Sequence, residues 1–409
     1  MLIGCIADDF TGGSDIASFF VKGGLRTVLY NGVPEEGIDA SIADVCVIAL
    51  KTRTQETKSA VKDSLTAVKW LESQGAKKFY VKYCSTFDST PKGNIGPICD
   101  AVMEYLETPY TILCPALPVN GRTVTNGCLY VHGVPLHESS MKDHPLTPMW
   151  DCDLVRLMSP QSKFQSFKLE TTTDYLDSFI ESCQTEVDGS SFYIIPDFEK
   201  SEDARTIVER FGNLPLLTGG SGLAELLAKQ YQKNTENNEF GKTDSPALLL
   251  AGSCSETTRN QIQQYEMSGG ESYFIDPLKL VTGEESVDHI WQQIISSDNT
   301  ILLYSSDTPD NVRKNQQQGN DGLAKMLEDT IAELAFRALQ AGYHRIIVAG
   351  GETSGAVIKK LGYSSYHIGE SVGPGVPIMI PTEDLQTRIV LKSGNFGEPN
   401  FFLQALSLT

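Results

Sequence analysis

The sequence predicts an α/β protein with two domains, each built on a mainly parallel sheet flanked by helices. Three observations predict this class. Short apolar runs alternate with stretches of helical periodicity in both halves of the chain. The length of 409 residues exceeds what one hydrophobic core usually serves. A polar stretch at 230–246 reads as a linker, so we expect domains at 1–232 and 246–409.

The first half alternates strands and helices in a way that favours a parallel sheet covered on both faces. Gly75 follows one of the expected helices and is a typical C-terminal stop. The expected strands are Leu2–Ala7, Arg26–Tyr30, Val45–Leu50, Lys78–Tyr83, Thr111–Cys114, Phe192–Ile195 and Leu214–Thr218. The expected helices are Ser14–Val21, Glu56–Ser73, Ile95–Leu106 and Glu202–Phe211.

The stretch 120–161 lacks periodicity and is rich in Gly, Pro, His and Asn, so we expect a long functional loop there. The α/β pattern returns in the second half of the chain. Its expected strands are Ala247–Ala251, Thr300–Tyr304 and Arg345–Ala349, and its expected helices are Thr257–Met267, Gly322–Ala341 and Ala356–Leu361.

The charge balance excludes some partners. A net charge of -19 disfavours binding to nucleic acid and to anionic lipid, and any anionic ligand needs a local cluster of cations and backbone N–H groups. Asp8 and Asp9 interrupt the apolar start, and no apolar run is long enough to span a bilayer. The nine cysteines form no CxxC pair. We therefore expect a soluble cytoplasmic protein with reduced thiols.

Ligands of open α/β sheets bind beyond the carboxyl ends of the strands. The first expected strand is followed by Asp8 and Asp9 in the sequence ADDFTGGSD. A capping role at the start of the helix would account for either carboxylate alone, since Asp is a preferred N-cap residue. Two of them beside a glycine turn favour a functional role, in binding substrate hydroxyls or in accepting a hydroxyl proton.

Cations follow several successive strands of the first half. Taken singly, each is an ordinary solvated surface charge, but their coincidence at strand ends predicts an anion pocket. Ser85 and Asp88 lie in the polar segment 84–94 and are assigned to the same pocket. The cations are Lys51, Arg53, Lys82, Lys92 and Arg122.

The second half carries three turns of small residues, after the strands that end at Ala251 and Ala349 and at 392–397. Glycine lets a backbone approach a phosphate, and converging N–H groups with a helix dipole favour an anion. Each turn alone is weak evidence, whereas three predict a nucleotide phosphate site. The residues assigned to it are Ser253, Ser255, Gly350, Gly351, Glu352, Thr353, Ser354, Gly394 and Gly397.

Other motifs fail. Gly241–Thr243 resembles the tail of a P-loop, but Glu236 stands where the upstream glycine is required. No GxGxxG follows a strand, which disfavours a dinucleotide enzyme. His132, His137 and His144 match no zinc spacing, so the metal ligands stay unassigned.

The sequence resembles the four-carbon acid sugar kinases over nearly its whole length. The resemblance is carried by IADDFTGGSD at the start, VAGGETSGA near the end, and three longer segments typical of the 3-oxo-tetronate 4-kinase branch: 82–97, 115–124 and 137–149. It implies an N-terminal domain for the sugar acid and a C-terminal domain for ATP. Gly13 departs from the family, where alanine is common.

The resemblance implies that ATP contacts fall on Ser253 or Ser255, on 350–354, and on Gly394 or Gly397. The hypothesis is phosphoryl transfer in a cleft between the domains, from ATP with bridging Mg²⁺ to the terminal hydroxyl of a 3-oxo four-carbon acid. Asp9 or Asp8 orients that hydroxyl, and Lys51, Arg53, Lys82 and Arg122 hold the carboxylate and oxo groups.

Several alternatives stay open. In one of them, the substrate is a non-oxidised acid such as threonate or erythronate. A nucleotide-dependent ligase or dehydrogenase and a non-catalytic sugar-acid sensor are the others. The stereochemistry of the acid, the identity of the base and the oligomeric state, a homo-oligomer included, are not decided by the sequence.

Overall fold

The structure is a computed structural model of the chain. It describes all residues except 36, 39, 41–42, 144–146, 172–174, 232–239, 297–299, 307–321 and 395. The chain divides into two compact units, Met1–Asn237 and Asn238–Thr409. Residues 232–239 of the linker expected at 230–246 lie outside the described residues. No helix among the described residues combines the length and the apolar character needed to cross a bilayer.

The first unit is built on a parallel sheet, whose strands follow one another in the order β2-β3-β1-β4-β11-β5-β10-β9. Strands β1, β3 and β10 are buried along their full length, as expected when helices cover both faces. The strands are β1 (Ile3–Ala7), β2 (Thr27–Asn31), β3 (Val45–Ala49), β4 (Lys78–Lys82), β5 (Tyr110–Cys114), β9 (Gln165–Leu169), β10 (Phe192–Pro196) and β11 (Leu216–Gly219).

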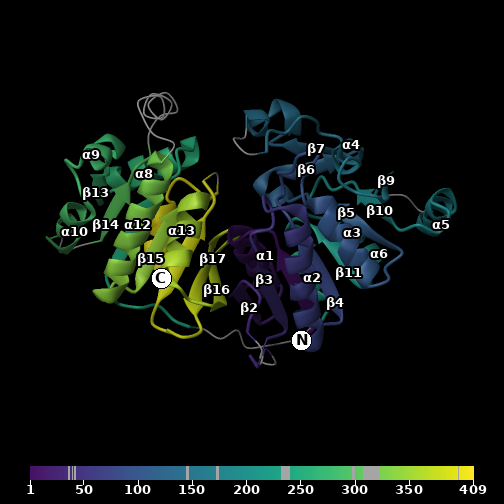
Figure 1. Ribbon diagram of the computed structural model, residues 1–409, viewed down its shortest axis with the longest axis horizontal. Helices are drawn as coiled ribbons and strands as arrows, with labels where there is room; N and C mark the ends of the chain where they lie inside the picture. The colour runs from purple at the N-terminus through teal and green to yellow at the C-terminus, as the bar shows by residue number, and fades with distance from the viewer. Residues whose placement is uncertain are drawn as a thin grey trace. The chain divides into compact units, whose positions relative to one another are not determined.

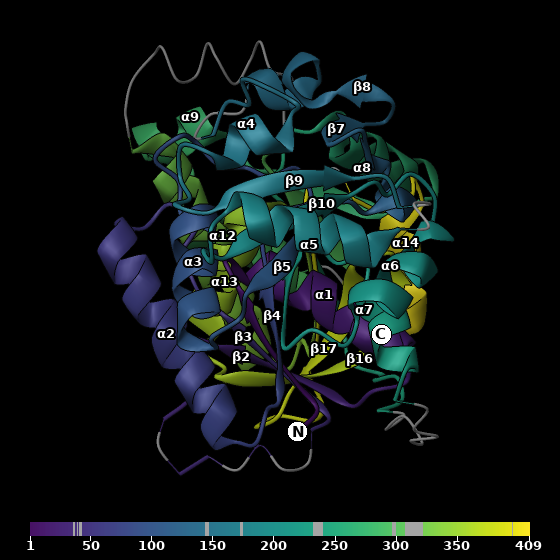
Figure 2. The same cartoon turned by 90° about the vertical axis from the view of Figure 1, so that its right-hand side faces the viewer.

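Helices cover both faces of this sheet (Figure 2). The pair α2 and α3 packs on one side, and the pair α1 and α7 packs on the other. As predicted, α2 ends just before Gly75, which adopts a φ of 87°. The helices are α1 (Phe10–Lys22), α2 (Thr57–Ser73), α3 (Ile95–Tyr105), α4 (Leu154–Met158), α5 (Leu176–Glu186), α6 (Asp203–Phe211) and α7 (Ala224–Lys229).

The second unit has a mixed sheet in the order β13-β14-β12-β15-β18-β17-β16. Pairing is parallel from β13 to β18 and antiparallel from β18 to β16. Helices α12 and α13 pack together beside β12 and β15 (Figure 1). The strands are β12 (Ala247–Ala251), β13 (Glu271–Phe274), β14 (Ile301–Tyr304), β15 (Arg345–Ala349), β16 (Ser365–Gly373), β17 (Val376–Pro381) and β18 (Arg388–Lys392). The helices are α8 (Glu256–Met267), α9 (Pro277–Thr282), α10 (Val287–Ser296), α12 (Leu323–Gln340), α13 (Gly351–Leu361) and α14 (Phe401–Leu408).

The stretch 120–161 is not the long loop that the sequence predicted. It forms a small antiparallel sheet in the order β6-β7-β8, followed by short helices. A disulfide joins Cys128 to Cys152, so the prediction of reduced thiols is wrong for these two cysteines and holds for the other seven. The elements are β6 (Arg122–Thr125), β7 (Cys128–Val131), β8 (Val134–Pro135) and the 3₁₀ turns η1 (Pro118–Asn120), η2 (Leu136–Glu138) and η3 (Ser140–Asp143).

The predicted class, two α/β domains with mainly parallel sheets flanked by helices, is confirmed. The predicted strands and helices were found within four residues of their bounds, except that the helix expected at Ala356–Leu361 begins five residues earlier, at Gly351. Strands β16, β17 and β18, which pair with one another as consecutive antiparallel neighbours, were not predicted.

Gly23 offers a test of the packing between α1 and α7. A Cβ at residue 23 would lie 2.4 Å from Ala228 Cβ and 2.5 Å from the Glu225 carbonyl oxygen. Gly23→Ala should therefore lower the free energy of unfolding by about 1–3 kcal/mol, as overpacking usually does. In urea denaturation, Gly355→Ala is the matched control: its Cβ meets no atom within 4 Å, so helix propensity should leave stability unchanged or raised. Equal stability of Gly23→Ala and the wild type would contradict this account.

Candidate substrate and nucleotide sites

The turn after β1 carries the adjacent carboxylates of Asp8 and Asp9. Asp9 is the N-cap of α1, and its Oδ1 accepts a hydrogen bond from the Gly12 N–H at 2.5 Å. A Cβ at residue 12 would stand 2.7 Å from Asp9 Oδ1 and 3.1 Å from Lys82 Nζ, so this close approach requires glycine. The capping role considered from the sequence is confirmed for Asp9, whereas Asp8 makes different contacts.

Arg53 holds both carboxylates. Its Nε and Nη2 donate to the two oxygens of Asp8 at 2.8 and 3.0 Å, and its Nη1 lies 2.8 Å from Asp9 Oδ2. Burial raises the pKa of the Asp8 carboxyl against the attraction of Arg53. Of the five N–H groups of the guanidinium, these contacts use three, which leaves one each on Nη1 and Nη2 for a ligand.

Lys82 is the last residue of β4, and its side chain is only 3% exposed. Its Nζ donates to the Tyr83 carbonyl oxygen at 3.0 Å and lies 3.6 Å from Asp15 Oδ2. Burial opposes the charged form, but Asp15 and then Asp8 attract the proton strongly enough to raise the pKa of Lys82. The ammonium is therefore a permanent charge beneath the turn after β1.

The segment after β4 adds further groups to this cluster. Phe87 and Asp88 have φ values of 64° and 30°, a conformation that costs energy in non-glycine residues and is typical of functional sites. It places Asp88 Oδ2 3.8 Å from Arg53 Nη1. The Ser85 side chain lies beside residue 220 of the turn after β11. Burial lowers the pKa of Arg122, while the charges of Asp88 and Asp15 oppose that shift.

A pocket opens over this cluster. Lys51 does not line it: its side chain is exposed and borders a separate surface pocket with Gly32 and Asp63. Of the predicted cations, only Arg53 and Lys82 line this pocket, and Arg122 does not. Lys92, at the end of the same polar segment as Asp88, is exposed as well. The polar residues that line the pocket are Asp8, Thr52, Arg53, Ser64, Lys82, Tyr83, Asp88, Ser89 and Asn94.

The sequence did not single out Asn94, Asp15 or Ser221. The Asn94 amide donates to the carbonyl oxygens of Thr52 and Gln55 at 2.7 and 2.8 Å, so it fixes the backbone beside Arg53. Ser221 donates its hydroxyl hydrogen to Asp15 Oδ2. Asp15 is buried within α1. The signal that could have found Asp15 is an acid among the apolar residues of an otherwise buried helix face.

The structure brings the three small-residue turns of the second unit together. They follow β12, β15 and β18, which are neighbours in the sheet and end at the same edge. The Gly252 N–H donates to the Ala349 carbonyl oxygen at 3.0 Å. A Cβ on Gly394 would stand 2.3 Å from Ser253 Oγ, and one on Gly252 would stand 2.1 Å from Thr353 Oγ1. Small residues are therefore what lets these turns meet.

The turn after β15 leads straight into a helix. Gly350 has a φ of 131°, which side-chain-bearing residues rarely adopt, and α13 begins at Gly351. The first N–H groups of such a helix have no partner within the helix and attract anions. Ser354 Oγ is buried and has no hydrogen-bond partner among the described residues. Glu352 lies exposed in the same first turn.

The remaining predicted residues shape the turn after β18. Ser255 caps α8 and donates its hydroxyl hydrogen to the Gly394 carbonyl oxygen at 2.6 Å. Gly397 has a φ of 83°, and its carbonyl oxygen accepts from Gln261 Nε2 at 3.0 Å. These residues therefore order the turn through its backbone.

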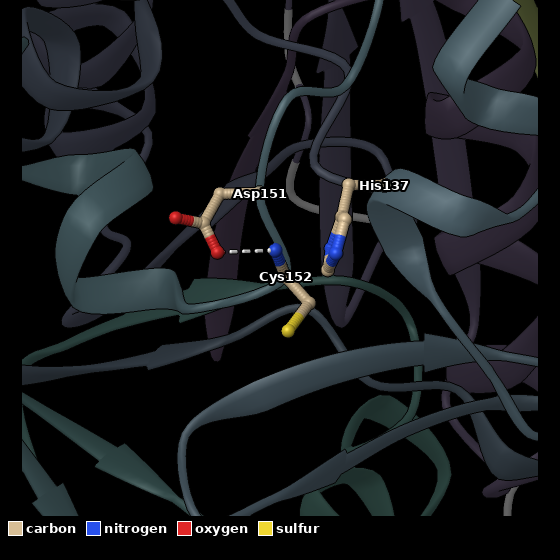
Figure 3. A group of neighbouring side chains, drawn as sticks. All are labelled: His137, Asp151 and Cys152. Carbon is tan, nitrogen blue, oxygen red and sulfur yellow. Dashed lines mark hydrogen bonds between the residues drawn. The ribbon is translucent and has the colours of Figure 1, made fainter.

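One cluster among the described residues has the composition of a metal site: His137, Asp151 and Cys152 (Figure 3). Two of its three residues are already engaged. Cys152 is in the disulfide, and Asp151 accepts from the Cys152 N–H at 2.7 Å and from Arg156 Nη2 at 2.7 Å. A thiolate is what binds a metal ion, so this cluster does not support one. His144 lies outside the described residues.

The fold and these two sites define a class: a two-unit α/β protein with a charged pocket in one unit and a glycine-lined anion cradle in the other. Residues 3–227 match the family model of a sugar-binding N-terminal domain, and residues 248–402 match that of a nucleotide-binding C-terminal domain. The chain belongs to the family that joins these domains, which confirms the resemblance seen in the sequence.

Individual relatives agree. The chain is 39% identical over 409 residues to a 3-oxo-tetronate kinase of Haemophilus influenzae, covering 98% of each chain. It is 41% identical over 417 residues to a 3-oxo-tetronate kinase of Burkholderia multivorans, covering 99% of this chain and 96% of the relative.

Solved structures share the whole architecture. A Salmonella typhimurium LT2 chain, provisionally described as a tRNA synthase, has a TM-score of 0.89 and 38% identity and covers 100% of this chain and 99% of its own. A Haemophilus influenzae protein has a TM-score of 0.78 and 39% identity over 99% of each chain.

The Asp15–Lys82 pair gives a second prediction. Asp15→Asn keeps an acceptor for Ser221 but leaves the Lys82 ammonium buried without its neighbouring charge. The free energy of unfolding should fall by about 3–5 kcal/mol, as when one partner of a buried ion pair is removed. Adding Lys82→Met should return most of that loss, measured by urea denaturation of the single and double variants. Additive losses in the double variant would show that the two side chains are not coupled.

Proposed function

We propose that this chain transfers the γ-phosphoryl group of ATP to the terminal 4-hydroxyl of 3-oxo-tetronate. One observation carries the proposal. The unit that matches a nucleotide-binding domain gathers three small-residue turns at one sheet edge, while the unit that matches a sugar-binding domain gathers cations and carboxylates. A phosphoryl donor and a polyhydroxy acid call for these two environments.

In this proposal, the phosphates of ATP lie against the turns after β12, β15 and β18. The residues assigned to them are Ser253, Ser255, Gly350, Gly351, Glu352, Thr353, Ser354, Gly394 and Gly397. The buried Ser354 hydroxyl supports the assignment, since a ligand oxygen would supply the partner that the described residues do not. Mg²⁺ would be carried mainly by the phosphates, as is usual for this ion, and would neutralise charge on them.

The sugar acid would occupy the pocket above Arg53. The two remaining N–H groups of Arg53, together with Lys82 and Arg122, are proposed to hold the carboxylate and oxo groups. Ser85 and Asp88 would bind hydroxyl groups. The geometry gives Lys51 no part in this pocket, since it borders a different one. Substrate binding is assigned to Arg53, Lys82 and Asp88, which line the pocket, and to Ser85 and Arg122, which do not line it.

Asp9 is the better candidate for the group that orients the attacking hydroxyl. Its side chain is 33% exposed, against 11% for Asp8. Asp8 spends both oxygens on the Arg53 fork, so it is suited to hold the guanidinium in place. Asp9 keeps an exposed edge while Arg53 and the Gly12 N–H fix its direction. A carboxylate held in this way can accept the hydroxyl proton as phosphoryl transfer proceeds.

The first test is an ATP-consumption screen over stereoisomeric four-carbon acids and their 3-oxo forms. We expect ADP release only with a 3-oxo-tetronate, and phosphorus NMR should place the new ester on the 4-oxygen. Turnover with threonate or erythronate instead would favour the non-oxidised substrate. Binding of the acid without ADP release would favour a sensor, and a requirement for a second acceptor would favour a ligase. The net charge of -19 argues against a tRNA substrate, which serves as a negative control.

The second test is Asp9→Asn. Asparagine is as good an N-cap as aspartate, so α1 and the melting temperature should be preserved. The lost carboxylate should lower kcat by about 10²–10⁴, the usual contribution of a positioned base. Asp63→Asn, beside Lys51 in the separate pocket, is the matched control and should leave kcat unchanged. Wild-type turnover by a folded Asp9→Asn variant would remove Asp9 from any essential role.

A further inference from the structure

Lys392 lies beside the three small-residue turns, and it is not among the residues assigned to the nucleotide site. It is the last residue of β18 and pairs in register with Ala349 of β15. Its backbone carbonyl oxygen accepts from the Gly350 N–H at 2.9 Å, so it lies directly behind the turn that opens α13. The residue is 0% exposed, which means that its ammonium has no access to solvent.

Among the described residues, the ammonium is bound only by neutral groups. Its Nζ donates to Thr258 Oγ1 at 2.9 Å, to the Gly394 carbonyl oxygen at 3.0 Å and to the Ser393 carbonyl oxygen at 3.2 Å. It also lies 5.6 Å from the centre of the Phe401 ring, a favourable position for a cation. No ion pair to Lys392 occurs among the described residues.

The absence of a counter-charge holds for every element around it. None of the ionisable side chains on the adjoining turns and helices forms a described ion pair with Lys392, and burial alone lowers its pKa to about 7. A buried cation without an anion is costly, and proteins usually pair it or neutralise it. The ionisable residues on the turns after β12 and β18 and on helices α8 and α13 are Cys254, Glu256, Arg259, Tyr265, Glu266, Glu352, Lys359, Lys360 and Glu398.

The contacts of Lys392 also decide which way a peptide group points. The Gly394 carbonyl oxygen accepts from Ser255 Oγ at 2.6 Å, from Thr258 Oγ1 at 3.0 Å and from Lys392 Nζ at 3.0 Å. An oxygen held in this way cannot turn toward an anionic ligand, which it would repel. The turn after β18 is thereby kept in a form that an anion can approach.

We propose that Lys392 is a positioning residue for nucleotide phosphates: its ammonium turns the Gly394 carbonyl inward and supplies a buried positive charge whose counter-charge is the bound nucleotide. This inference rests on the proposed nucleotide site. Because Lys392 is fully buried, it acts through the turn and through space and does not touch the phosphates.

The proposal makes nucleotide binding depend on a proton. Near pH 7 part of the free protein has a neutral Lys392, and an anion brought close raises the pKa of an ammonium. The bound state therefore holds more protons than the free state. Affinity should be greatest below the free-state pKa and should fall as pH rises through about 7, by up to roughly tenfold per pH unit.

The experiment is calorimetric titration of the full chain with ADP at pH 7.5, in buffers of different ionisation enthalpy. The wild type should take up a large fraction of one proton per ADP bound, about 0.5–0.9. Lys392→Met should take up close to none, bind ADP at least about tenfold more weakly at pH 6.5, and lose the pH dependence. Lys359→Met, an exposed lysine of α13, is the matched control and should behave as the wild type.

A second readout separates this role from a merely structural one. Without nucleotide, Lys392→Met should melt at the same temperature as the wild type or higher, because a buried unpaired cation has been replaced by an apolar chain. A purely structural lysine would instead lower stability and leave proton uptake unchanged. ADP binding to the wild type without proton uptake would overturn the inference while leaving the proposed function intact. No ADP binding at all would overturn both.

Discussion

Both candidate sites depend on a cation buried at the carboxyl end of a parallel strand. Lys82 ends β4 in the first unit, and Lys392 ends β18 in the second. A parallel sheet directs the residues after every strand to one edge, so the turns gather around whatever charge the strand ends supply. In a chain with a net charge of -19, such buried cations are what makes an anion site available at all.

The two lysines differ in how their charge is balanced. Lys82 has the Asp15 carboxylate 3.6 Å away, and Arg53 nearby is held by Asp8 and Asp9. The two cations of this cluster therefore face three carboxylates, so the cluster carries no excess positive charge, although Arg53 keeps N–H groups that a ligand can use. Lys392 has only neutral acceptors among the described residues. Its surroundings carry an excess positive charge that a ligand can neutralise.

The sequence predicted the parts of this arrangement that follow from local patterns. Buried strands such as β1 and β15 are continuous apolar runs, so the turns after them could be found and their chemistry inferred. The stretch 120–161 could not be predicted, because its strands are short and its Cys128–Cys152 disulfide joins residues 24 apart in sequence. The expectation that all thiols are reduced failed for the same reason.

Within the sites, sequence order named most of the groups but not their partners. Lys51 and Arg53 are two residues apart after the same strand, yet only Arg53 faces the carboxylates. The strand has ended before both residues, so their side chains do not follow its regular alternation. Asp15 escaped notice because it lies inside a helix whose other buried residues are mostly apolar or small. In the sequence, Lys392 appears only as the first residue of a small-residue turn. Its burial depends on how the second unit folds.

These charge balances match the ligands proposed for each unit. A four-carbon sugar acid is a single anion bearing hydroxyl groups, and it is best met by donors and acceptors in nearly equal measure. A nucleotide carries several negative charges on adjacent phosphates, so a buried cation that has no counter-charge among the described residues suits it. The buried ion pairs of the first unit and the unpaired lysine of the second are thus two solutions to one electrostatic requirement. Exchanging the two charge arrangements would weaken the binding of each proposed ligand. An Asp near Lys392 would be a permanent counter-charge, and the phosphates would then have no unbalanced positive charge to neutralise.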